Sequence, residues 1–545
     1  MKSKAIVAAL AFATIFFAIL MPPEAHAAGK MAVLLCSTFA FFGRLAEHRI
    51  PSRYLWGGLV LFATVLIHSL AISVDLYRSL DFIAMVWSYY CVLGFFIYAD
   101  FDPSKLLAAS LVLLSLVVTG YGLYQYLWGF DQLYTYIVYS GSDEVVKAPA
   151  LDRVASRRVF STLALPGTLW GFLVVALPFH AALWGRRRVL NLVLATSAAM
   201  LLTTGFLTRS FGFLLGLFVL AVAWLILRYR RLVWNWLTVV VLILALSGGM
   251  FYWARRGAIE DANPASLRLM NWLAGWTIAA ANPWGVGLNN YGIVYPQHKL
   301  PQANETQYAH STALQLLAEL GYPVVFAGAA LLLFAITRWS SIRRLRFSPW
   351  IALALLVWSV HNLVDINVYF GSVGTVGAVL IGALLWKEQS SAVPVHRIPV
   401  ACIAVLGTAA IIFSALAFFS SELQHRAQVE YDSNKPLAAL DTLRQAQSFM
   451  PLNSSLFFDA GEIFLYVHHR MHKPEYLELA AESYRRAIAL SPAKSGPHIG
   501  LALCRSSAND INGALEEIQI AKELYPDSSY VQSVARLISQ SKDSR

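Results

Sequence analysis

The longest polar interruption in this apolar chain runs from residue 263 to residue 321, and it carries side chains that can do chemistry. Asn263-Pro264 predicts a helix start, because an Asn side chain caps helices and Pro suits the first turn. On a helix running to about residue 281, Arg268 and Trp272 share one face. A guanidinium beside an aromatic ring suits a phosphate-binding wall. The alternative is an ordinary surface arginine in a long loop.

His310 begins a second apolar-periodic helix in the same stretch, which leads into a predicted membrane span. A neutral imidazole at the membrane surface can accept the proton of a sugar hydroxyl. A structural histidine on an apolar face is the alternative. Glu319 lies about half a turn round the helix from His310, so we do not expect the two side chains to pair directly.

Two further arginines lie at predicted membrane edges. Arg158 precedes the segment 159–167, and Arg209 lies in a tight hairpin that reads Leu207-Thr208-Arg209-Ser210-Phe211-Gly212. A charge at the bilayer edge is costly enough to be a functional hypothesis by default. Snorkelling of the arginine to lipid headgroups is the alternative.

The composition predicts the elements that position these side chains. The chain is 58% hydrophobic and 13% charged, whereas soluble domains are about 25% charged. A spanning helix needs about 20 apolar residues. Besides an N-terminal apolar run, candidate spans lie near residues 31–43, 55–72, 82–99, 106–127, 165–184, 189–207, 211–227, 232–252, 322–337, 348–364, 370–386 and 398–418. The predicted fold class is therefore all-α, a polytopic helical membrane bundle of about 12–13 spans followed by a soluble helical repeat domain.

Charge gives the predicted orientation. Of the 42 Lys and Arg residues, 13 lie from Ser420 onward against 15 Asp and Glu, so the excess of positive charge belongs to the preceding membrane part. Basic residues concentrate in the short loops on one side of the predicted spans, which marks that side as cytoplasmic. Loops 128–164 and 253–321 and the tail then face outward from the cytoplasmic (inner) membrane, towards the periplasm or the cell exterior.

Three domains follow from these patterns. Residues 1–28 combine a basic start, an apolar run and Ala25-His26-Ala27, so they are a signal-like segment or an uncleaved first membrane helix. Residues 29–419 form the membrane domain, and residues 420–545 form the repeat domain. In that tail, Ala480, Tyr484, Ala487 and Pro492 recur 34 residues later as Ala514, Ile518, Ala521 and Pro526. A related set starts at Ala439, and 34 residues is the tetratricopeptide period. An irregular helical tail is the alternative.

Several familiar motifs are missing from the sequence. It contains no Walker motif, no Asp-x-Asp in an outward loop and no His-Glu-x-x-His, so neither ATP use nor a dedicated metal site is supported. We expect no cofactor and no nucleic-acid partner.

In this order, these stretches resemble the O-antigen ligase family, which includes polysaccharide polymerases and protein oligosaccharyltransferases. Arg268 with Asn282-Pro283-Trp284-Gly285-Val286-Gly287 is similar to the family's Arg…Asn-Pro-x-Gly-x-Gly, and 310–321 to its His-Asn/Ser…Leu-Gln…Glu-x-Gly. The hairpin at 207–212 is similar to its Thr-x-Ser-Arg-Gly turn, but Phe211 stands where the family has arginine. Arg209 can replace that arginine only if the hairpin is irregular there.

The resemblance implies an inverting, metal-independent glycosyltransferase that works in the outer leaflet. The donor would be a glycan on polyprenyl diphosphate, and the acceptor would be lipid A-core, another glycan or a protein. It implies His310 as the base and Arg268, Arg209 and Arg158 as diphosphate ligands. Polymerase or protein-transferase activity is one alternative. A non-catalytic membrane scaffold, whose repeats recruit a protein partner, is another.

Overall fold

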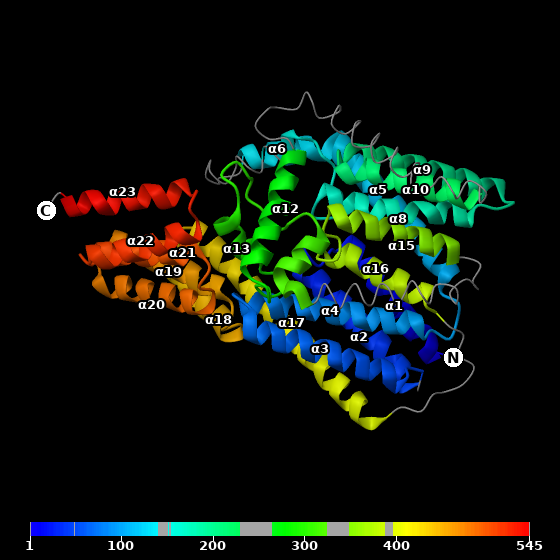
Figure 1. Ribbon diagram of the computed structural model, residues 1–545, viewed down its shortest axis with the longest axis horizontal. Coiled ribbons are helices and arrows are strands. Elements are labelled where there is room, and N and C mark those ends of the chain that lie inside the picture. Colours follow the sequence, from blue (N-terminus) through cyan, green and yellow to red (C-terminus); the bar gives the residue numbers. More distant parts are fainter. Residues whose placement is uncertain are drawn as a thin grey trace. The chain divides into compact units, whose positions relative to one another are not determined.

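The computed structural model describes residues 2–47, 49–139, 151, 154–228, 264–323, 348–386 and 396–543. All regular elements within these ranges are helices, so the described chain is all-α as predicted (Figure 1). It divides into two compact units. The described residues of 1–58, 85–263 and 331–404 form the first unit, and those of 59–84, 264–330 and 405–545 form the second.

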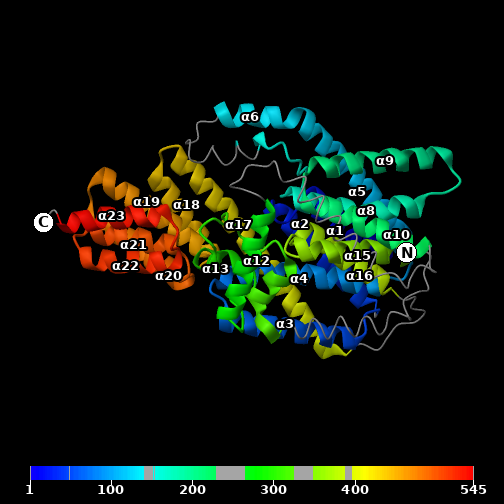
Figure 2. The ribbon, with the colours of Figure 1, turned by 45° about the horizontal axis from the view of Figure 1, so that its top comes forward.

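The first unit is a bundle of apolar helices built around α8. It contains α1 (Lys2–Leu20), α2 (Ala27–Ala46), α5 (Ser104–Tyr124), α8 (Pro166–Leu183), α9 (Arg188–Leu207), α10 (Phe211–Arg228), α15 (Ser348–Val364) and α16 (Gly371–Leu384). Helix α8 packs against α5, α9, α10, α15 and α16 (Figure 2). It is apolar on every side, with Trp170, Phe172 and Phe179 fully buried. This is the character of a helix at the centre of a bundle.

Length and composition confirm several predicted spans. Among the described residues, seven helices are long and apolar enough to cross a membrane, and shorter apolar helices cover 5–20, 212–223, 349–364 and 371–384. The run predicted at 31–43 is the 20-residue helix α2. The predicted spans at 232–252 and, from residue 324 onward, 322–337 lie outside the described residues.

One helical segment is longer than the sequence predicted. Helix α5 continues through a π-helical turn (Gln125–Gly129) into α6 (Phe130–Tyr139), so the outward loop expected from residue 128 begins as helix. Helix α1 places Ala11, Ile15 and Ile19 in the core of the first unit. A retained first membrane helix makes contacts of this kind, so we keep that interpretation of residues 1–28 as a prediction.

Three helices contribute residues to both units: α3 (Ser52–Ile72), α4 (Leu76–Ile97) and α17 (Arg397–Asp432). Helix α17 is 36 residues long and runs without a break through the expected domain boundary at 419/420. Its apolar part ends near residue 419, and its last turns are polar. The membrane part and the repeats are thus joined by continuous helix and not by a loop.

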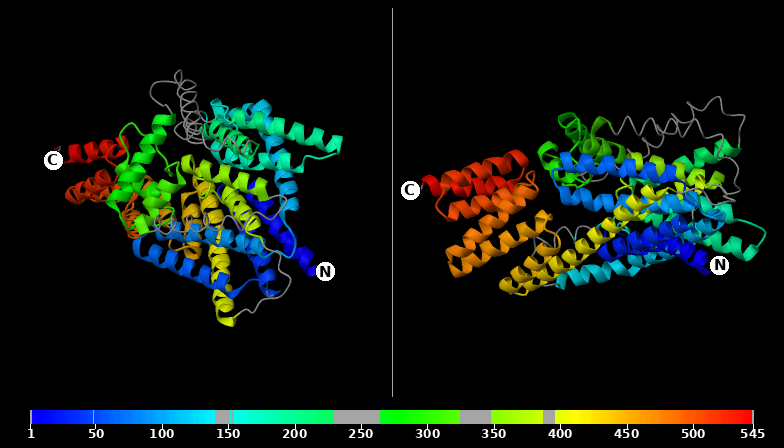
Figure 3. Two further views of the ribbon diagram at one scale, coloured as in Figure 1. Left: turned by 45° about the vertical axis from the view of Figure 1, so that its right-hand side comes forward. Right: turned by 90° about the horizontal axis from the view of Figure 1, so that it is seen from below.

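The repeats are antiparallel helices that succeed one another in the second unit, as the orange to red part of Figure 3 shows. They are α18 (Pro436–Phe449), α19 (Ser454–Met471), α20 (Pro474–Leu490), α21 (Ser495–Ser507), α22 (Ile511–Leu524) and α23 (Ser529–Asp543). All six recurring alanines of the sequence pattern are fully buried, at 0% exposed. Small residues let the paired helices approach closely, which explains the tetratricopeptide-like period.

Candidate functional site

Residues 264–321 of the second unit are predicted to face outward and are called the outward segment below. They are organised by α12 (Pro264–Ala281) and α13 (Tyr291–His298). Asn271 of α12 is fully buried and holds the two helices together. Its side-chain oxygen accepts a hydrogen bond from Tyr295 Oη at 2.6 Å, and its carbonyl accepts one from Tyr291 Oη at 2.8 Å. Burial raises the pKa of Tyr291 well above its usual value and that of Tyr295 to about 12, so both phenols stay neutral donors.

The two glycine-bearing turns of this segment pack closely against each other. Gly285 and Gly321 both have positive φ, +86° and +75°. A Cβ on Gly285 would lie 2.2 Å from the Glu319 carbonyl oxygen, and one on Gly321 would lie 2.3 Å from the Pro283 carbonyl oxygen. Gly287 N donates to the Glu319 carbonyl at 2.9 Å, and Tyr322 N donates to the Pro283 carbonyl at 3.0 Å. Side chains do not fit where the two backbones meet, so both positions require glycine.

Glu319 is a fully buried carboxylate that fixes the entry to α13. Its two oxygens accept Asn289 N at 2.6 Å and Tyr291 N at 3.1 Å, at the helix N-terminus. Gln315 Nε2 donates to the same carboxylate at 3.1 Å. A negative charge is favourable there because it meets the free N–H groups and the positive end of the helix dipole. Glu319 is therefore a positioning residue that ties the 312–323 helix to the start of α13.

His310 lies just before the helix over residues 312–323, and its backbone has φ +53°. Two hydrogen bonds hold this left-handed conformation: Ala309 N donates to Gln315 Oε1 at 3.0 Å, and Trp272 Nε1 donates to the His310 carbonyl at 3.2 Å. A non-glycine residue in this region costs of order 1–3 kcal/mol and often marks a functional site. The half-buried imidazole is thus set by both α12 and the 312–323 helix.

Arg268 lies one helical turn before Trp272 on α12, on the face that meets the His310 segment. Its side chain is half-buried. Farther along this face, a Cβ on Gly275 would touch Leu314 and Ala309 at 3.6 and 3.8 Å. The structure therefore brings the predicted cation Arg268 and the predicted base His310 into one packed substructure.

The other two predicted cations meet in the first unit, at the turn between α9 and α10. Arg158 Nε donates to the Thr208 carbonyl at 3.1 Å, and Arg209 Nη1 donates to the Ser156 carbonyl at 3.3 Å. Arg209 has φ +47° and lies between the two helices, so the hairpin is irregular at this residue. This is the condition under which Arg209 can take the place of the displaced family arginine.

A buried polar cluster beside that turn was not predicted from the sequence. His361 Nδ1 and Asn367 Nδ2 are 2.7 Å apart, and Asp365 Oδ1 accepts Ile366 N at 2.9 Å. A Cβ on Gly212 would lie 2.2 Å from His361 Nε2, so the cluster reaches the Arg209 hairpin. The sequence signal is a run of polar residues, His361-Asn362-x-x-Asp365-x-Asn367, at the end of an apolar span. The two arginine-bearing sites lie in different units.

Within the described residues, no three His, Cys, Asp or Glu side chains gather in a way that could hold a metal ion. The arrangement offers cations, an imidazole and buried carboxylates. These groups can bind phosphate and move a proton.

The fold and these sites define a polytopic all-α membrane protein with an ordered segment at 264–321 and a helical repeat tail. Residues 196–327 match the family model described as O-antigen ligase. This part of the chain is therefore similar to the O-antigen ligase family, and the matched range includes Arg209, Arg268 and His310 but not Arg158. Among the curated proteins, none matches the chain.

Solved structures similar to the chain include tetratricopeptide proteins. The first tetratricopeptide domain of Spaghetti (RPAP3) bound to an HSP90 peptide is 16% identical, covers 23% of this chain and 96% of its own, and has a TM-score of 0.21. The first such domain of human RPAP3 is 17% identical over 23% of this chain and 94% of its own, also at 0.21. The Cut9–Hcn1 hetero-tetramer of APC/C is 11% identical, covers 94% of this chain and 93% of its own matched chain, and has a TM-score of 0.21. The repeat assignment rests on the period and the helix pairs described above.

Proposed function

We propose that this protein transfers a glycan from a polyprenyl diphosphate to an acceptor hydroxyl at the outer face of the cytoplasmic membrane, without a metal ion. The observation that carries the proposal is the joint placement of Arg268 and His310 through Trp272, inside the segment that matches the ligase family. A fixed cation and a fixed imidazole on one substructure are what the two halves of such a transfer need.

In the proposed reaction the acceptor oxygen attacks the anomeric carbon, and the bond from that carbon to the diphosphate oxygen breaks. The leaving diphosphate takes the electron pair, and arginines stabilise its charge. His310 accepts the proton of the acceptor hydroxyl as the new bond forms. Attack opposite the leaving group inverts the anomeric centre. Arg268 is the proposed diphosphate ligand of this segment. Arg209 of the α9–α10 turn and Arg158, which donates to the Thr208 carbonyl of that turn, are the other proposed ligands.

The test measures donor binding and transfer separately in purified full-length protein. His310→Ala should lose about 10²–10⁴-fold in transfer and keep donor binding, because the arginines dominate that binding. Arg268→Ala should weaken both. Arg268→Lys should still impair transfer, because an ammonium cannot make the two-pronged contact of a guanidinium. His298→Ala is the matched control, since His298 ends α13 in the same segment.

Unchanged transfer in both His310→Ala and Arg268→Ala would favour the scaffold alternative. Loss of donor binding together with transfer in His310→Ala would move His310 into the diphosphate site. Parallel assays with lipid A-core, glycan and protein acceptors separate ligase, polymerase and protein-transferase activity.

A further inference from the structure

A cleft of about 350 Å³ lies within the second unit between the outward segment and the repeats. One wall consists of Ile293 and its neighbours on α13, together with Gln307, which precedes His310 by three residues. The opposite wall consists of Phe458, Lys494 and Tyr525 from α19, the α20–α21 turn and the residue after α22. This volume is within the range of about 300–1,000 Å³ that is usual for small-molecule sites.

Ion pairs and hydrogen bonds hold the repeats against the outward segment around this cleft. Lys494 Nζ lies 3.1 Å from Oδ2 of Asp75, a buried residue immediately before α4, and Ser454 Oγ donates to the same oxygen at 3.2 Å. Tyr525 donates a hydrogen bond to Glu305, and Lys299 Nζ lies 2.6 Å from that carboxylate. Both walls are therefore fixed before any ligand binds, which lowers the cost of binding.

The cleft has a positive character. Two cations line it, Arg78 and Lys494, and none of its described lining residues is acidic; Lys494 is also paired with the buried Asp75, so Arg78 supplies the excess positive charge. Arg78 Nη1 donates to Gln307 Oε1 at 3.0 Å, which leaves the fork of the guanidinium with further N–H groups for a ligand. Burial lowers the pKa of Lys494, and the neighbouring Asp75 opposes that effect. A carboxylate matches this pair of cations.

The rest of the lining suits a sugar ring. Phe458 and Tyr525 offer flat apolar faces, and Ser455 and Ser495 offer hydroxyl groups. Sugars present apolar C–H faces and a rim of hydroxyls, so aromatic rings and serines match them better than a uniformly apolar groove would. Gln307, which lines the cleft, precedes the proposed base His310 by three residues in the same segment.

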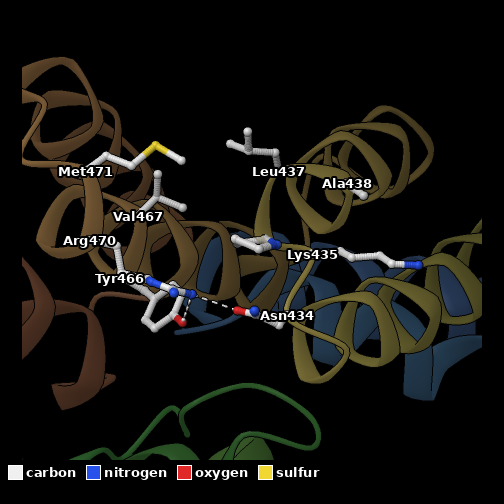
Figure 4. A pocket seen from close by; sticks show the side chains of 9 residues that line it. Asn434, Lys435, Leu437, Ala438, Tyr466, Val467, Arg470 and Met471 are labelled. Atoms are coloured by element: carbon white, nitrogen blue, oxygen red, sulfur yellow. Dashed lines mark hydrogen bonds between the residues drawn. The ribbon is translucent and has the colours of Figure 1, made fainter.

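We propose that this cleft binds an acidic sugar unit of the acceptor glycan, whose carboxylate is held by Arg78 and Lys494. The inference rests on the proposed function, and it makes the repeats part of acceptor recognition. A second cleft, of about 480 Å³, lies between the start of α18 and the end of α19. There Arg470 Nη1 donates to Asn434 Oδ1 at 2.7 Å, as Figure 4 shows. Arg470 thus donates to a side-chain amide oxygen, as Arg78 does, but no described lining residue of this second cleft belongs to the outward segment.

The experiment measures binding of three ligands to purified full-length protein: a glucuronic-acid oligosaccharide, a neutral glucose oligosaccharide of the same length, and an oligoglutamate peptide. We expect the acidic sugar to bind best and Arg78→Gln to weaken it about 10-fold or more, the effect of losing a charge-assisted hydrogen bond. Arg470→Gln is the matched control and should change the Kd less than twofold. Ser495→Trp, which fills the cleft, is a second variant in case Arg78→Gln does not fold.

Equal binding of the acidic sugar to wild type and to both cleft variants would overturn the inference. Tighter binding of oligoglutamate would also overturn it and would make the cleft a peptide-docking site. Failure of the proposed function is distinguishable, because His310→Ala should abolish transfer while leaving acidic-sugar binding intact. If no acceptor is glycosylated but Arg78→Gln still weakens sugar binding, the cleft assignment stands and the transfer reaction does not.

Discussion

Glu319 is the buried carboxylate that positions the start of α13 in the outward segment. Its buried carboxylate accepts two backbone N–H groups at the start of α13 and the Gln315 amide. Glu319→Ala should destabilise the protein by about 3 kcal/mol or more, because it leaves these buried donors without an acceptor. Glu319→Gln keeps one acceptor oxygen and should cost less. Thermal unfolding measures both, and Glu516→Ala, whose side chain is 78% exposed, is the control. An unfolding temperature unchanged in Glu319→Ala would contradict this role.

Glu24, in the turn between α1 and α2, should give the protein a pH-dependent stability. It accepts hydrogen bonds from the backbone N and the hydroxyl of Ser372, and burial raises the pKa of its carboxyl from 4.5 to about 6. The folded state then binds this proton more tightly than the unfolded state. The resulting stability, at most about 2 kcal/mol, is present below pH 4.5 and is lost as the pH rises through 6. The difference in unfolding free energy between wild type and Glu24→Gln should therefore shift between pH 4.5 and pH 7. A constant difference would show that Glu24 does not titrate in this window.

The sequence predicted Arg268 and His310 as site residues, because motif spacing singles out rare polar residues in an apolar chain. It did not predict the contacts that fix the positions of these two residues. The left-handed backbone of His310 and the Trp272 contact depend on residues that are 38 positions apart. The cluster of His361, Asp365 and Asn367 was not predicted, because a single polar residue at the end of an apolar span gives no signal that it will meet the others.

Turns 282–287 and 319–322 pack backbone against backbone. Because a Cβ on Gly321 would lie 2.3 Å from the Pro283 carbonyl oxygen, Gly321→Ala must push the two turns apart. The strain of positive φ adds to that clash, so we expect a loss of about 2 kcal/mol or more in stability. Transfer should fall with it, because the turns position the α13 entry and the His310 helix.

Gly129→Ala is the matched control for Gly321→Ala. The nearest atom to a Cβ there is 3.6 Å away, an ordinary contact. The measurements are thermal unfolding and transfer in the same preparation. Wild-type values for Gly321→Ala would mean that the turns can separate without consequence.

Helix types and most helix positions were predictable, because apolar runs of spanning length and a 34-residue period are strong signals. Helix ends were less so. The continuation of α5 through a π-turn into α6 and the length of α17 arise from local backbone choices that composition does not encode. The step from Ala439 to Ala480 is 41 residues, seven more than the tetratricopeptide period, and the left-handed cap at His472 and the proline start of α20 lie within this step.

The whole molecule should be oriented with the outward segment and the repeats on the same, non-cytoplasmic side. Leu300→Cys and Tyr530→Cys place thiols at exposed positions, 39% and 60%, in a background where the exposed Cys402 is serine. A membrane-impermeant thiol reagent should label both in intact cells or, in a bacterium with an outer membrane, in spheroplasts. Arg187→Cys, in a loop predicted to be cytoplasmic, should be labelled only after the membrane is opened. Protection of both outward sites would reverse the orientation.

Helix α17 has a consequence for how the repeats are carried. A helix of 36 residues is about 54 Å long, whereas the hydrocarbon core of a bilayer is about 30 Å thick. The polar end of α17 is therefore the first helix of the repeat domain: Ala427 is buried in one core with Ala439 and Leu443 of α18, and Gln424 donates to Asp459 of α19 at 2.7 Å. One inserted residue within this end would turn the residues beyond it by about 100°, and Ala427 or its neighbours would then leave that core. The same helix thus belongs to both the apolar part and the first repeat, so a change of its length is felt in the packing of the first repeat.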